Sequence, residues 1–90
     1  MGMIYKDTLT LLQRKYGAKI HNPIHKSECF CFVGYDGEKY FQLDSYGSSK
    51  RLNTDKISQQ TQFDRECALY IAQILIDWFD LKRDLNLDKE

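Results

Sequence analysis

Two histidines and two cysteines lie within eleven residues of one another, and both residue types are ligands that zinc prefers. They are His21, His25, Cys29 and Cys31. Their spacing argues against a metal site, because Pro23 keeps the histidines off a common helical face and Cys-x-Cys is not the Cys-x2-Cys spacing of zinc knuckles. A Cys–His nucleophile pair lacks an accompanying oxyanion-hole motif. We therefore expect no catalytic residues, no metal and no cofactor, and thus a protein that is not an enzyme.

A run of small residues followed by a cation is the second feature that bears on ligand chemistry. The backbone N–H groups of Tyr46-Gly47-Ser48-Ser49-Lys50 could hold an anion. The run lacks the Gly-x4-Gly-Lys-Ser/Thr spacing of a phosphate-binding loop, and it follows a predicted strand instead of opening a helix. It therefore predicts no nucleotide site.

Composition limits the class of protein. Ninety residues with 42% hydrophobic content fit a single domain, and 13 basic residues balance 13 acidic ones. A neutral chain lacks the overall charge that is typical of nucleic-acid binders. The charges are unevenly distributed, since residues 1–63 hold nine basic and six acidic residues, whereas residues 64–90 hold four and seven. We expect a mildly bipolar molecule.

The cysteines and the apolar stretches bear on location. Three cysteines, in a chain that does not begin with a signal-like apolar segment, predict reduced thiols in the cytoplasm. The longest apolar stretch, CALYIAQILIDWF, is interrupted by Gln73 and Asp77 and is shorter than the about 20 residues of a membrane span. No membrane partner is expected.

Helical periodicity occurs at both ends of the chain, with alternating segments between them. Apolar residues recur at helical spacing before Gly17, which suits a helix C-cap; they are Tyr5, Leu9, Leu12 and Tyr16. Asp64 suits the N-cap of a second helix, whose wide apolar arc includes Cys67, Ile71, Ile74, Leu75 and Trp78. The sequence predicts an α+β fold, a small antiparallel sheet of a β-hairpin plus a third strand, with both helices packed on one face. The predicted bounds are 1–17 for the N-terminal helix, 28–63 for the strands, 64–84 for the C-terminal helix and 85–90 for a frayed tail.

The hairpin is predicted from Asp36-Gly37 between two alternating segments, because that dipeptide favours a two-residue type I′ turn. Such a turn would place four apolar residues on a core face: Phe30, Phe32, Phe41 and Leu43. The thiols of Cys29 and Cys31 would point to the opposite, open face. The third strand, KISQQTQF, alternates in the same way and would extend both faces.

The open face is therefore predicted to be polar. Its candidate binding residues, with those of the loop at its edge, are Tyr40, Gln42, Tyr46, Ser48, Lys50, Arg51, Lys56, Ser58, Gln60 and Gln62. One interpretation is an ordinary solvated face, which antiparallel sheets often have. The other is a binding surface, because Tyr, Gln and Ser donate and accept hydrogen bonds with little charge, which suits nucleic-acid bases or a protein partner.

The segment KYFQLDSYGSSKRLNTDKISQQTQFDRECALYIAQIL resembles the transcriptional positive-cofactor family of single-stranded DNA-binding coactivators in its strand, basic loop, strand and helix layout. The resemblance implies that Tyr40 and Tyr46 stack on bases, that Lys50, Arg51 and Lys56 contact phosphates, and that the helix dimerises. The patterns at Tyr40 to Ser48 and Lys56 to Gln59 are also similar to small uncharacterised reading frames of bacteria and mobile elements, which imply no activity.

Two functions follow as hypotheses. The first is a small protein-interaction or inhibitor protein of bacterial, phage or mobile-element origin that uses the polar sheet face. The alternative is a single-stranded nucleic-acid-binding protein. In either case the apolar arc around Leu69, Ile76 and Phe79 predicts a homodimer through the C-terminal helix, unless the N-terminal helix covers the same surface.

Overall fold

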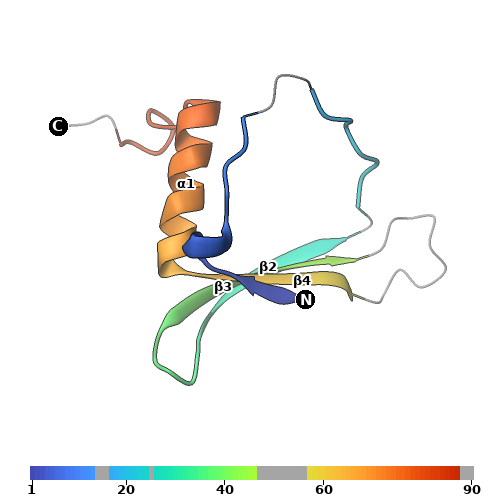
Figure 1. The fold of residues 1–90 in the computed structure, drawn as a ribbon, viewed down its shortest axis with the longest axis vertical. Coiled ribbons are helices and arrows are strands. Elements are labelled where there is room, and N and C mark those ends of the chain that lie inside the picture. The colour runs from blue at the N-terminus through green and yellow to red at the C-terminus, as the bar shows by residue number, and fades with distance from the viewer. Residues whose placement is uncertain (14–16, 25, 47–56, 88–90) are drawn as a thin grey trace.

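The chain forms a four-stranded sheet and one long helix in a computed structural model, which describes residues 1–13, 17–24, 26–46 and 57–87 (Figure 1). The elements are β1 (Gly2–Ile4), a 3-10 turn (Lys6–Thr8), β2 (Ser27–Val33), β3 (Lys39–Tyr46), β4 (Ile57–Asp64) and α1 (Arg65–Phe79). The strand order is β1-β4-β3-β2, with β1 parallel to β4 and the other neighbours antiparallel. The predicted α+β class is confirmed.

The predicted N-terminal helix at 1–17 is wrong. Met3 lies in β1 and pairs with Gln62 of β4, and among the residues of this segment that the structure describes the helical ones are a single 3-10 turn, Lys6–Thr8. The Thr8 hydroxyl donates to the Tyr5 carbonyl over 3.1 Å, and Leu9 already has extended backbone angles. Over a short segment, the spacing of apolar residues is compatible with either a helix or a strand. Here the backbone of residues 2–4 pairs with the edge of β4, and the spacing of apolar residues gives no sign of this pairing.

The hairpin between β2 and β3 has a three-residue loop instead of the predicted two-residue turn. Gly34 N–H donates to the Glu38 carbonyl over 2.9 Å, and Gly37 N–H donates to the Gly34 carbonyl over 3.0 Å. Of the central residues only Gly37 has a positive φ, of 80°, whereas a type I′ turn needs two such residues. The loop is therefore a type I turn followed by a left-handed glycine.

This loop moves the pairing by one residue, so Phe32 lies opposite Tyr40 and Phe30 lies opposite Gln42. The predicted core face of Phe30, Phe32, Phe41 and Leu43 is wrong, because a one-residue slip moves every side chain of one strand to the other face. Phe30 and Phe32 share a face with Tyr40, Gln42, Gln60 and Gln62, which we call the amide face. Cys29, Cys31 and Val33 lie instead on the helix-side face, with Phe41, Leu43 and Phe63.

Helix α1 rises from the helix-side face (Figure 1). Its N-cap is Asp64, as predicted, and the Asp64 carboxylate accepts a hydrogen bond from Cys67 N–H over 2.9 Å. Beneath this first turn the rings of Phe41 and Phe63 stack with centroids 5.3 Å apart, and Cys67 is fully buried. The core therefore lies where β4 turns into α1.

The helix ends at Phe79, five residues before the predicted end, because Asp80 adopts the left-handed conformation with φ 57°. Its last turn extends away from the sheet, so Trp78 and Phe79 are 80% and 63% exposed. Among the described residues, no helix has the length and apolar content needed to cross a membrane.

Candidate functional site

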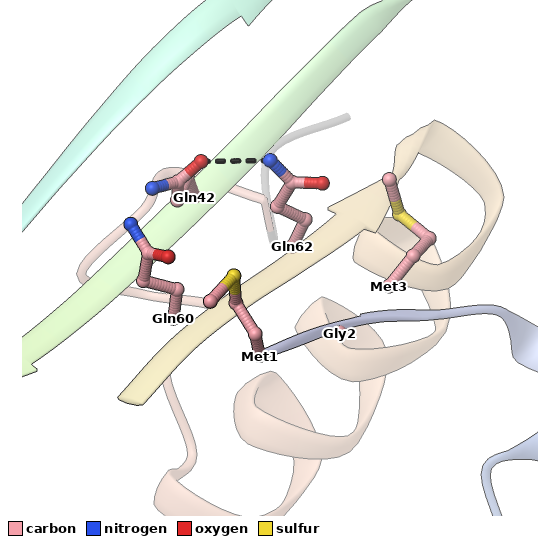
Figure 2. A pocket seen from close by; sticks show the side chains of 6 residues that line it. All are labelled: Met1, Gly2, Met3, Gln42, Gln60 and Gln62. Atoms are coloured by element: carbon pink, nitrogen blue, oxygen red, sulfur yellow. Dashed lines mark hydrogen bonds between the residues drawn. The ribbon is translucent and has the colours of Figure 1, made fainter. Parts of the chain in front are cut away.

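A chain of side-chain hydrogen bonds runs across the amide face from β4 to β3. Gln62 Nε2 donates to Gln42 Oε1 over 2.7 Å (Figure 2). Gln42 Nε2 in turn donates to Asp44 Oδ1 over 2.8 Å. The register places Gln42 directly opposite Gln62, which explains the first of these bonds. Gln42 and Asp44 are only 8% and 6% exposed, so neighbouring side chains hold this network in a single arrangement.

A shallow pocket of about 240 Å³ lies beside this network. Met1 and the first two residues of β1, Gly2 and Met3, line one side, while Gln60 and Gln62 of β4 line the other side with Gln42. In Figure 2 these glutamines project from one side of the strands, and the helix lies behind the sheet. The two methionines add flexible, polarizable apolar surface to a face that is otherwise rich in amides.

An aromatic row extends the amide face towards β2. The ring centroids of Phe30 and Phe32 are 5.8 Å apart, and those of Phe32 and Tyr40 are 5.5 Å apart with nearly parallel planes. Sequence reasoning missed both phenylalanines as surface residues because the assumed two-residue turn placed them in the core. A glycine at position 37 also suits the left-handed position of a three-residue hairpin loop. Considering that loop would have placed Phe30 and Phe32 on the open face.

Both tyrosines of β3 donate their hydroxyl protons to carboxylates. The Tyr40 hydroxyl donates to Asp36 Oδ2, and this hydrogen bond raises the pKa of Tyr40 to about 12 and lowers the pKa of Asp36. The Tyr46 hydroxyl donates to Glu28 Oε1 over 2.7 Å, which raises the pKa of Tyr46. Because their hydroxyls already have acceptors, both rings are fixed in orientation before any partner binds.

Carboxylates outnumber cations on the described part of this face. Glu28 lies directly opposite Asp44, and Asp36 lies at the hairpin tip beside Tyr40. Lys26 is a nearby cation, and its Nζ lies 4.3 Å from the centroid of the Tyr46 ring. Three acidic groups around an aromatic and amide surface favour a cationic partner over the phosphates of a nucleic acid.

The structure brings together four of the ten predicted binding residues: Tyr40, Gln42, Gln60 and Gln62. Tyr46 lies at the end of β3, where the pairing with β4 shifts by one residue. Ser58 belongs to β4, but its side chain is not among the described ones. Ser48, Lys50, Arg51 and Lys56 lie outside the described residues.

The thiols occupy a different face from the one predicted. Cys29 and Cys31 are free and exposed on the helix-side face, because the corrected register turns them away from the glutamines. His21 is exposed, and His25 lies outside the part of the chain that the structure describes. Within that part, no three His, Cys, Asp or Glu side chains are grouped closely enough to hold a metal ion.

Comparison with known proteins adds no relative from which a role could be transferred. No protein-family model matches the sequence, and no curated protein or solved structure matches it.

Proposed function

We propose that this chain is a non-enzymatic binding module whose amide face binds a basic surface of a protein partner, as a small inhibitor or adaptor protein would. The observation that carries this proposal is the fixed Gln62–Gln42–Asp44 network, with Glu28 and Asp36 beside it. Its setting is the cytoplasm, where the exposed thiols of Cys29 and Cys31 stay reduced.

These side chains are held in place before a partner binds, and this supports a role in binding. Conformational entropy lost on association weakens binding, and here the amides and both tyrosine rings are already held by hydrogen bonds. Aromatic side chains are enriched at protein interfaces, and Phe30 is 46% exposed next to the network. The carboxylates provide charge complementarity to Lys or Arg side chains of the partner.

The proposal is tested by a pair of equal charge reversals. Glu28→Lys changes the amide face, and Glu66→Lys makes the same change on the exposed side of α1. A partner is first isolated on immobilised protein from the cells that make this chain, and its affinity is then measured by surface plasmon resonance. We expect Glu28→Lys to weaken binding about tenfold and to reduce its salt dependence.

The control should leave affinity within about twofold, because Glu66 lies away from the amide face. Capture of no specific partner at low salt would contradict the proposal. So would a partner whose binding is weakened by Glu66→Lys and left unchanged by Glu28→Lys.

Single-stranded nucleic-acid binding is the second candidate, and the row of Phe30, Phe32 and Tyr40 is the observation that favours it. Aromatic rings on an open sheet face stack on bases, at about 1 to 3 kcal/mol per base. Fluorescence anisotropy of a labelled oligothymidylate at two salt concentrations separates the candidates. The protein-binding proposal predicts no salt-sensitive binding, whereas affinity that falls with salt and with Tyr40→Ala or Lys50→Ala would favour nucleic acid.

We also propose that two copies associate through α1. Leu75, Trp78 and Phe79 are 43%, 80% and 63% exposed, and they lie on one side of the helix because each residue advances about 100° around its axis. The N-terminal segment reaches the helix at Tyr70, whose ring centroid is 6.0 Å from Lys6 Nζ, and no N-terminal helix covers the apolar arc within the described residues. A second copy would remove these side chains from water.

A further inference from the structure

A second pocket, of about 510 Å³, lies on the helix-side face, where the start of α1 meets the hairpin. The helix follows β4 in the chain and packs on β4 and β3, so its first turns form a wall above the sheet (Figure 1). The strand order places β3 and then β2 as the floor beside this wall. A volume of about 300 to 1,000 Å³ is typical of small-molecule sites.

Most of the pocket lining is aromatic or aliphatic. The rings of Phe41 and Phe63 stack with centroids 5.3 Å apart and are half-buried, and the small side chain of Ala68 lines the pocket on the helix. Val33 and Cys31 continue the lining on β2, where both are exposed. Such a surface favours a flat aromatic ligand, because aromatic rings attract one another in offset-stacked and edge-to-face arrangements.

Two cations line the same end of the pocket. The register pairs Tyr40 with Asp64, so Lys39 and Arg65 are the next residues beyond this pair, at the same end of the ladder. Both are exposed and both line the pocket. The Asp64 carboxylate balances one of them, and it already accepts the N–H of Cys67 as the helix cap. One positive charge therefore remains at this end of an otherwise apolar pocket.

We propose that this pocket binds a small aromatic carboxylate, with its ring against Phe41 and Phe63 and its carboxylate beside Lys39 and Arg65. The remaining charge favours an anion, and the lining favours an aromatic body over an inorganic ion. A guanidinium group can hold a carboxylate through two parallel hydrogen bonds. The pocket lies on the opposite side of the sheet from the amide face, so this site does not depend on the proposed protein partner.

The two exposed thiols of β2 report the position of the ligand. Cys31 lines the pocket, whereas Cys29 lies two residues away on the same face of the strand and outside the pocket. The wild-type protein is treated with iodoacetamide with and without 2-naphthoate, and alkylation of each cysteine is followed by mass spectrometry. We expect saturating 2-naphthoate to slow alkylation of Cys31 about tenfold and to leave the rate at Cys29 within about twofold, because thiol reactivity depends on access.

A neutral ligand of the same shape tests the cations. 2-Naphthamide has the same rings without the charge, and we expect about tenfold more of it to be needed for equal protection of Cys31. Lys39→Gln and Arg65→Gln should each reduce this preference to about threefold or less. Lys82→Gln removes an exposed cation beyond the end of α1 and should leave the preference unchanged. Circular dichroism confirms that each variant is folded.

The outcomes that would overturn the proposal are distinct. Unchanged alkylation of Cys31 at millimolar 2-naphthoate, or equal protection of Cys29 and Cys31, would exclude the pocket as the site. Equal protection by 2-naphthoate and 2-naphthamide would exclude recognition of an anion, and so would a preference that survives both Lys39→Gln and Arg65→Gln. Failure to capture a protein on the amide face would change none of these results.

Discussion

At the scale of single residues, the hydrogen bond from Tyr40 to Asp36 connects the hairpin loop to the amide face. Asp36 also accepts from the N–H of Glu38 over 2.9 Å, so one carboxylate stabilises the turn and orients the ring that stacks on Phe32. The aromatic row thus depends on a residue of the loop.

The pKa of Tyr40 tests this link. Its folded value of about 12 lies above the ordinary 10.0, so the stabilisation is complete below about pH 10 and is lost as pH rises through 12. The lowered pKa of Asp36 acts at the other end, where stabilisation present above 3.8 is lost as pH falls through the folded value. We expect Asp36→Asn to bring the Tyr40 pKa back towards 10, measured by phenolate absorbance with Tyr40→Phe as the reference. An unchanged titration would show that the bond does not persist in solution.

Neighbouring side chains leave too little space for a Cβ atom at Gly34. A Cβ atom at this position would lie 2.8 Å from Tyr40 Cε2 and 2.9 Å from Asp36 Oδ1, whereas at Gly17 it would meet nothing within 4 Å. We predict that Gly34→Ala lowers the free energy of unfolding by about 1 to 3 kcal/mol. Urea denaturation measures it, with Gly17→Ala as the control that stays within about 0.5 kcal/mol. Equal effects of the two variants would refute the close contact.

At the scale of elements, the start of α1 depends on Asp64. Its carboxylate accepts from Cys67 N–H, next to the buried core, and such caps contribute about 0.5 to 2 kcal/mol. Asp64→Ala should lower the free energy of unfolding by that amount, and Asp64→Asn, which keeps an acceptor oxygen, by less. Thermal unfolding followed by circular dichroism is sufficient to compare them. Identical losses in both variants would argue that charge, and not the cap hydrogen bond, is what matters.

The same elements show what the sequence could predict. The polar alternation of β3 and β4 and the N-cap of α1 were predictable, because each depends on residues close together in the chain. The hairpin register was not, since Asp36-Gly37 fits two loop lengths and the choice reverses the face of β2. Strand β1 could not be predicted because three residues are too few to show an alternating pattern. Its extended conformation depends on pairing with β4, which is distant in the sequence.

At the scale of the whole molecule, the exposed apolar side chains of α1 predict self-association. Trp78→Ser removes the most exposed of them, while Gln73→Ala alters the polar side of the same helix. We expect sedimentation equilibrium to show a dimer for the wild type and for Gln73→Ala. For Trp78→Ser we expect dimerisation weakened by about 2 kcal/mol, or about thirtyfold. A monomeric wild type at micromolar concentration would contradict the dimer.

The central claim is that the amide face binds a protein partner, and two adjacent glutamines of β4 test it most directly. Gln60 lies on the amide face and lines its pocket, whereas the exposed Gln59 points to the helix-side face. A photo-crosslinking benzoylphenylalanine is placed at each position in turn, in the cells that make the protein. We predict that position 60 forms a covalent adduct with one specific protein that position 59 does not. The opposite pattern, or adducts with nucleic acid at position 60, would contradict the account.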